Sequence, residues 1–162
     1  GLTTNGILLE KLARPLSAAG LDSINSSLDT LDPDGFRSLA RAGSLEQVLG
    51  GLEEARRFFS NLKLNAVVVR GRNEDQIPAL CRYARARGIA MRFIEFMPLD
   101  GDKAWDRNQL VPETEILKRV SEVAPLEPAA ADRGSPARRW LFADGLGEVG
   151  VIASVSSWPY NG

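Results

Sequence analysis

The chain has 162 residues, of which 44% are hydrophobic and 25% charged, which is enough apolar material for one domain with a sizeable core. Lysine and arginine total 20 against 21 acidic residues, so no global field draws the chain to nucleic acid or to an anionic membrane. No apolar run approaches the roughly 20 residues that span a bilayer, and no leader sequence opens the chain, so we expect a cytoplasmic protein.

The chain contains no histidine and a single cysteine, Cys81. The missing histidine removes the commonest general base and metal ligand. One thiol forms neither an internal disulfide nor a cysteine metal cage, and Cys81 lies in an amphipathic helical pattern where a packing role is expected. The sequence therefore offers no metal site and no catalytic side chain of its own.

The first elements follow each other closely. Apolar spacing predicts a helix over about residues 7–19, ended by Gly20, and then a short strand within residues 21–29. Asp32 and Pro33 next suit the N-cap and first residue of a further helix.

A longer helix is predicted to begin at Ser44, with Gln47 as its capping-box partner, and to end near Phe59. Gly50 and Gly51 weaken it by about 1 kcal/mol each relative to alanine. They indicate either close packing against a neighbour or a break in the helix.

Residues 62–69 are rich in β-branched side chains and form the strongest strand prediction, followed by a helix over 74–87 and a strand over 90–97. Strands that alternate with helices of this length predict βαβ units and a parallel sheet. The fold class is therefore α/β.

The pattern changes beyond residue 102. A helix is predicted over 113–123, a loop over 125–136, and an antiparallel hairpin formed by 138–144 and 147–155, in a separate piece from the parallel sheet. We divide the chain into residues 1–104 and residues 105–162, the second beginning a C-terminal subdomain.

The strand over 90–97 carries charges where a strand core should be apolar. Alternation places Met91, Phe93, Glu95 and Met97 on one face, and Arg92, Ile94 and Phe96 on the other. Burial of a charge is costly unless it finds a partner. Arg92 and Glu95 therefore meet a ligand or each other, and a structural ion pair is the simpler alternative.

Polar side chains also gather where the other strands end, and together they suit a ligand that carries phosphate. The candidates are Thr3, Thr4, Asn5, Asn25, Ser27, Asp29, Lys63, Asn65, Arg92, Glu95 and Met97. Each has a simpler interpretation: Thr4 or Asn5 as a helix cap, and Lys63 as a solvated ammonium. Three further arginines, at positions 133, 138 and 139, are expected in a solvated loop.

Several of these segments resemble one enzyme family in both order and spacing. They are Thr3-Thr4-Asn5-Gly6, Ile24-Asn25, Ser27-Leu28-Asp29, Lys63-Leu64-Asn65, Arg92-Phe93-Ile94-Glu95-Phe96-Met97, and Gly134 with Pro136-Ala137-Arg138. The family is the radical S-adenosylmethionine (radical SAM) GTP 3',8-cyclases, which begin molybdenum cofactor synthesis by converting GTP to a cyclic pterin precursor. The resemblance extends from Leu2 to Ser157.

The resemblance implies the later βα units of a partial (β/α) barrel followed by the start of a C-terminal α+β subdomain. Ser27 and Met97 match positions that contact S-adenosylmethionine, and Thr3, Lys63 and Arg92 match positions that contact GTP. In the full-length family, S-adenosylmethionine and two 4Fe-4S clusters supply a deoxyadenosyl radical that abstracts hydrogen from GTP. The implied partners are GTP and S-adenosylmethionine, and a homodimer is one of the open oligomeric states.

Cys81 alone cannot supply the ligands of either cluster. We therefore expect an internal segment of the enzyme that lacks both cysteine motifs and is inactive by itself. Ser26 also stands where the family usually has valine. Two alternatives are a cluster-free nucleotide- or phosphate-binding module and a segment of a different radical SAM enzyme.

Overall fold

The structure is a computed structural model, and it describes residues 1–40, 42–97, 107–130 and 136–153. The backbone divides into two compact units, Gly1–Ala66 and Val67–Gly162. These units do not test the predicted domain division after residue 104, which stays a prediction.

The first unit contains parallel strands β1 (Leu2–Thr4), β2 (Ser23–Ser27) and the start of β3 (Asn61–Val68). Each strand pairs with the next along the chain, so that Leu2 lies opposite Ile24 and Ile24 opposite Leu62. Helices separate these strands in the sequence, and the predicted βαβ arrangement is confirmed here.

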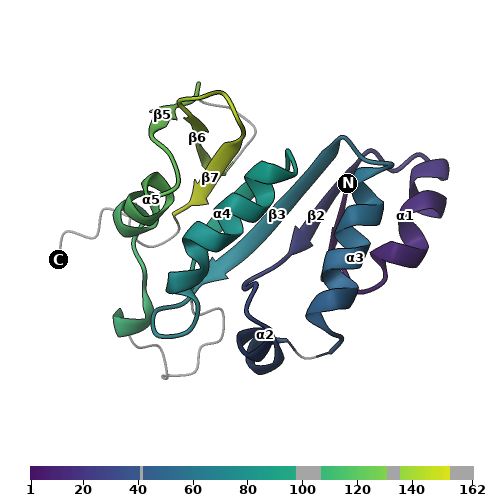
Figure 1. The fold of residues 1–162 in the computed structure, drawn as a ribbon, viewed down its shortest axis with the longest axis horizontal. Helices are drawn as coiled ribbons and strands as arrows, with labels where there is room; N and C mark the ends of the chain where they lie inside the picture. The colour runs from purple at the N-terminus through teal and green to yellow at the C-terminus, as the bar shows by residue number, and fades with distance from the viewer. Residues whose placement is uncertain (41, 98–106, 131–135, 154–162) are drawn as a thin grey trace. The chain divides into compact units, whose positions relative to one another are not determined.

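Helices α1 (Leu9–Ala18) and α3 (Leu45–Arg56) lie side by side in this unit (Figure 1). A Cβ atom on Gly51 would lie 2.7 Å from the carbonyl oxygen of Gly6 and 2.9 Å from Cβ of Leu9. Because α3 continues through Gly50 and Gly51, close packing is the correct alternative and a break is not.

Both predicted helix starts are confirmed. The Asp32 side chain accepts a hydrogen bond of 2.7 Å from the Gly35 N–H at the start of α2 (Pro33–Leu39). Ser44 and Gln47 form the complete capping box of α3. These bonds satisfy N–H groups that have no partner inside the helix, which is why short polar side chains mark helix starts in the sequence.

The second unit contains the end of β3 and the elements that follow it. They are η1 (Glu74–Gln76), α4 (Ile77–Ala86), β4 (Ala90–Glu95), η2 (Arg107–Gln109), α5 (Glu113–Ser121), β5 (Leu126–Pro128), β6 (Arg138–Phe142) and β7 (Glu148–Ile152). Strand β7 pairs in parallel with β4 and antiparallel with β6, which pairs antiparallel with β5.

The antiparallel hairpin of β6 and β7 is confirmed, but its expected separation from the parallel strands is wrong because Arg92 of β4 lies opposite Gly150 of β7. Strand β5 also lies inside the segment predicted as a loop. Its three residues end at Pro128, and cross-strand pairing with β6 holds them in place where local propensity gives no signal.

The core of the second unit forms on one face of β4 and β7. Phe93 and Val151 are completely buried and pair across the two strands, and Ile116 of α5 is buried as well. Burial of a side chain as large as Phe93 contributes about 1.5–3 kcal/mol. Among the described residues, no helix is both long and apolar enough to cross a membrane.

Candidate functional site

A row of polar side chains crosses the strands of the first unit. Thr3 lies opposite Asn25, and Asn25 lies opposite Lys63. Residues in register project from the same face of a sheet, whereas Leu62 and Leu64, on either side of Lys63, are buried on the other face. Lys63 is therefore half-buried among polar neighbours on one sheet face.

The next row toward the carboxyl ends of these strands contains Ser27 and Asn65, which lie opposite each other. The side-chain oxygen of Asn65 is buried and has no hydrogen-bond partner within the described residues. A buried acceptor without a partner costs about 1–3 kcal/mol, so a ligand donor at this position would be favoured. Ser27 ends β2 and is exposed.

A pocket of about 270 Å³ opens beside Ser27. It is lined by Asn5, Ile7, Ser27, Leu28, Asp29, Thr30, Phe36, Leu39, Ala40 and Ala42. Phe36 and Leu39 come from α2 and were missed by the sequence analysis, because an apolar residue in a helix gives no sign that it faces a cavity. The pocket combines an apolar wall with polar groups, which is the usual composition of a small-molecule site.

The turn after β1 is stabilised by its own side chains. Thr4 Oγ1 accepts a hydrogen bond of 3.2 Å from the Gly6 N–H, and Asn5 Oδ1 accepts one of 3.2 Å from the Ile7 N–H. The helix itself begins later, with Leu8 as the N-cap residue. The capping interpretation of Thr4 and Asn5 therefore describes the turn that leads into α1.

In the second unit, the predicted alternation of β4 is confirmed through its last residue. Met91, Phe93 and Glu95 are buried, whereas Arg92 and Ile94 are half-buried on the other face. Arg92 and Glu95 therefore project to opposite faces, which contradicts the structural ion pair considered as the simpler alternative.

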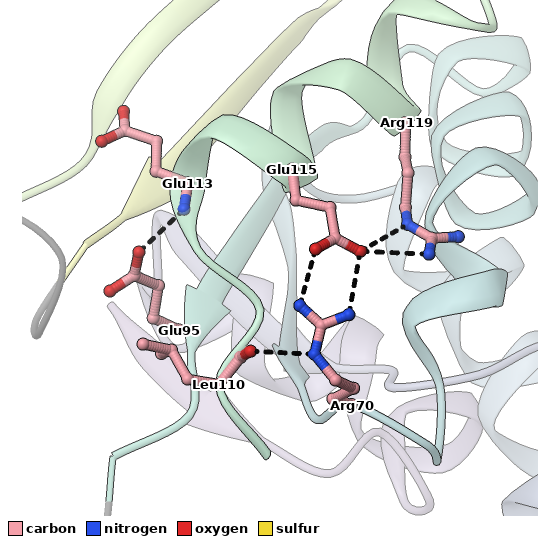
Figure 2. A network of polar contacts seen from close by, with 6 residues as sticks. All are labelled: Arg70, Glu95, Leu110, Glu113, Glu115 and Arg119. Carbon is pink, nitrogen blue, oxygen red and sulfur yellow. Dashed lines mark hydrogen bonds and ion pairs between the residues drawn. The ribbon is translucent and has the colours of Figure 1, made fainter. Parts of the chain in front are cut away.

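Glu95 instead stabilises the start of a helix. Its Oε1 accepts a hydrogen bond of 2.9 Å from the backbone N–H of Glu113, the first residue of α5 (Figure 2). A negative charge at a helix N-terminus is favourable because the first N–H groups point toward it. Met97 lies just beyond β4 and is 39% exposed.

Arg70, which follows β3, holds the segment before α5. Its guanidinium donates to both carboxylate oxygens of Glu115, at 3.2 and 2.6 Å, and its Nε donates to the Leu110 carbonyl at 3.2 Å (Figure 2). Arg119 also donates to Glu115. Hydrogen bonding to Arg70, supported by Arg119, holds the pKa of Glu115 below its ordinary value. The pairing of Arg70 with Glu115 gave no sequence signal, because the two residues are 45 positions apart in the chain.

The basic group predicted in a solvated loop is placed differently. Arg138 and Arg139 belong to β6, where Arg138 pairs with Glu113 at 3.3 Å and Arg139 pairs with Glu148 at 2.9 Å. The solvated-loop prediction is wrong for these two residues, because cross-strand pairing orders them. Arg133 lies outside the described residues.

Cys81 is buried in α4, and burial raises the pKa of its thiol to about 12. A thiol with such a pKa is neither a good nucleophile nor a good metal ligand at neutral pH. No group of three potential metal-ligating side chains occurs within the described residues. Cys81 therefore has the packing role that its helical pattern predicted.

Residues 1–84 match the model of the radical SAM superfamily, and residues 89–158 match the model named Molybdenum Cofactor Synthesis C. The parallel βα units and these matches place the chain in a single class of protein: it belongs to the radical SAM superfamily.

Similar proteins bear the name GTP 3',8-cyclase. One from Synechococcus sp. (strain WH7803) is 42% identical and covers 99% of this chain and 50% of its own length. Those of Acidothermus cellulolyticus and Streptomyces coelicolor are 43% and 44% identical over 96% of this chain, with 44% and 46% of their own lengths covered. The chain spans about half the length of the curated relatives it matches, and the resemblance found in the sequence is confirmed.

Proposed function

We propose that this chain contributes GTP and S-adenosylmethionine contacts to a GTP 3',8-cyclase, the enzyme named by its relatives and the first in molybdenum cofactor synthesis. The observation that carries the proposal is the Thr3–Asn25–Lys63 row on one face of the parallel strands. It offers a hydroxyl, an amide and an ammonium group in register, which suits a sugar and phosphate ligand.

In the proposed GTP site, Lys63 supplies a point charge to phosphate and Arg92 supplies a planar fork that binds two oxygens at once. Thr3 donates to, or accepts from, a hydroxyl of the nucleotide. The support for Lys63 and Arg92 is that each is half-buried on a strand face whose opposite side is core. Partial burial strengthens the attraction to an anion relative to a fully solvated cation.

For S-adenosylmethionine, the residues present fit a polar and aromatic ligand. Ser27 is one of the residues that line the pocket of about 270 Å³. Asn65, opposite Ser27 on the next strand, brings a buried oxygen without a partner among the described residues. We propose that Ser27 and Met97 contact this cofactor, whose chemistry when bound is the supply of a radical. The role of the chain is to bind and orient it.

The residues described here do not fit an iron–sulfur cluster. Cys81 is the single thiol of the sequence, and it is buried with a raised pKa. No step of the proposed function is therefore assigned to a cluster held by these residues. We also propose that residues 1–104 belong to the barrel and that residues 105–162 begin the C-terminal subdomain. Separate family matches, to residues 1–84 and to residues 89–158, support a division of the chain into two parts.

The experiment is a calorimetric titration of the chain with GTP at low ionic strength. Lys63→Ala and Arg92→Ala should each weaken binding, because each removes a cation from the phosphates. Cys81→Ser serves as the control and should bind like the parent. Equal affinity in all three variants and the parent would place the nucleotide elsewhere and overturn the proposal.

A further inference from the structure

Gly150 lies in the middle of β7, where a glycine normally weakens a strand. Its backbone does not require glycine, since the φ angle of Gly150 is not positive. The explanation must therefore lie in the space beside it. Strand pairing places Gly150 between Arg92 of β4 and Arg139 of β6, on the same sheet face as both.

The stem of Arg92 occupies the space that a side chain at position 150 would need. A Cβ atom built on Gly150 would lie 3.3 Å from Cγ of Arg92 and 3.2 Å from Cβ of Ala137. Both distances are tighter than ordinary carbon–carbon contact, which is about 3.5–4.0 Å. Ala137 is buried, and its Cβ is fixed to the backbone, whereas the longer arginine stem can rotate, so the stem would have to shift.

We propose that Gly150 is a positioning residue that fixes the path of the Arg92 side chain, and through it the place at which the guanidinium meets phosphate. The inference rests on the proposed function of Arg92. A shift of a few tenths of an ångström at Cγ is amplified along the remaining bonds of the side chain. Two-point binding of phosphate by a guanidinium depends strongly on that orientation.

Arg139, on the other side of Gly150, is directed elsewhere. Its guanidinium pairs with Glu148, two residues before Gly150 on the same face. Of these two arginines, only Arg92 therefore has its stem in the space that the missing Cβ of Gly150 leaves.

The test is a double-mutant cycle of Gly150→Ala and Arg92→Ala, read by calorimetric titration with GTP. Gly150→Ala should weaken binding about threefold or more, the size expected for contacting residues. In the Arg92→Ala background it should have no further effect. Gly50→Ala is the matched control, because its Cβ would approach only Glu10, at 3.8 Å.

Two results would overturn the inference while leaving the proposed function intact: Gly150→Ala binding like the parent while Arg92→Ala binds weakly, or an equal loss from Gly150→Ala in both backgrounds. If the parent binds no GTP, the proposed function fails, and the nuclear magnetic resonance signal of the Arg92 Nε–H group decides the inference. This signal is assigned by its loss in Arg92→Lys. It should move in Gly150→Ala and stay in place in Gly50→Ala, and an unmoved signal overturns the inference.

If Gly150→Ala does not fold, Ala137→Gly combined with Gly150→Ala provides the second variant. It removes the close contact with Ala137 and keeps the one with Arg92. The same loss of GTP affinity and the same movement of the Arg92 signal are expected. Parent-like values of both would contradict the positioning role.

Discussion

Glu95 and Glu113, two acidic residues 18 positions apart, are joined by a hydrogen bond of 2.9 Å from the backbone N–H of Glu113 to the carboxylate of Glu95. Glu95 is completely buried at the end of β4, and Glu113 begins α5. The bond fixes the start of the helix relative to the strand that carries Arg92. Glu95, which the sequence marked as a contact of a ligand or of Arg92, thus accepts a hydrogen bond from protein backbone.

Replacement of Glu95 tests this helix-capping role. Glu95→Ala should lower the free energy of unfolding by about 2 kcal/mol, since it removes a buried acceptor from a helix N-terminus. Glu95→Gln should cost less, because the amide oxygen still accepts the bond while the charge is lost. Urea unfolding gives both values, and hydrogen exchange at the Glu113 amide should accelerate in Glu95→Ala. An unchanged exchange rate would refute the assignment.

The adjacent glycines of α3 offer a matched pair of substitutions. Gly51→Ala should destabilise the chain by about 1–3 kcal/mol, because the new Cβ would meet the Gly6 carbonyl oxygen at 2.7 Å. Gly50→Ala should instead gain up to about 1 kcal/mol from helix propensity. Thermal unfolding of both variants is the measurement. The same sign in both would show that α1 does not pack on Gly51 as described.

Ser26 carries an unfavourable hydroxyl. It is completely buried, and its Oγ has no hydrogen-bond partner within the described residues. Ser26→Ala removes the unpaired oxygen without enlarging the side chain, so it should raise the free energy of unfolding by about 1–3 kcal/mol. Ser60→Ala, at an exposed position, is the control and should change it by less than about 0.5 kcal/mol. A destabilised Ser26→Ala would mean that the hydroxyl has a partner.

The Arg70–Glu115–Arg119 network makes the free energy of unfolding depend on pH in the acid range. The pKa of Glu115 is lowered in the folded chain from its ordinary value of 4.5, first by hydrogen bonding to Arg70. The ionised Glu115 side chain therefore contributes to the free energy of unfolding above pH 4.5. This contribution is lost as the pH falls through the lowered pKa that Glu115 has in the folded chain. Glu115→Gln should be less stable than the parent at pH 7, and the difference should shrink toward pH 3. A difference that stays constant over this range would contradict the pairing.

The local features of this fold were predictable from the sequence, and the long-range ones were not. Asp32, Ser44 and Gln47 mark helix starts because their hydrogen bonds reach only three residues along the chain. Strand β5 and the parallel pairing of β7 with β4 depend on partners distant in sequence. No local pattern encodes such pairing.

The same distinction holds for the candidate site. Lys63 and Arg92 stand out because a charged residue inside an apolar strand pattern is unusual. A single sequence does not predict that Arg70 pairs with Glu115, because the two residues are 45 positions apart. It also does not predict that the missing Cβ of Gly150 leaves space for a neighbouring side chain. The polar and charged residues alone predicted only a ligand that carries phosphate. The resemblance to a family was needed to predict GTP and S-adenosylmethionine as the ligands.

The central claim, that this chain recognises the phosphates of GTP, is tested most directly by titration with GTP and with guanosine under identical low-salt conditions. We predict that GTP binds more tightly than guanosine, that added salt reduces the difference, and that Lys63→Ala combined with Arg92→Ala abolishes it, since the cations act on the charged part of the ligand. Equal affinities of the parent chain for GTP and guanosine, or a GTP preference that survives in the double variant, would contradict the account.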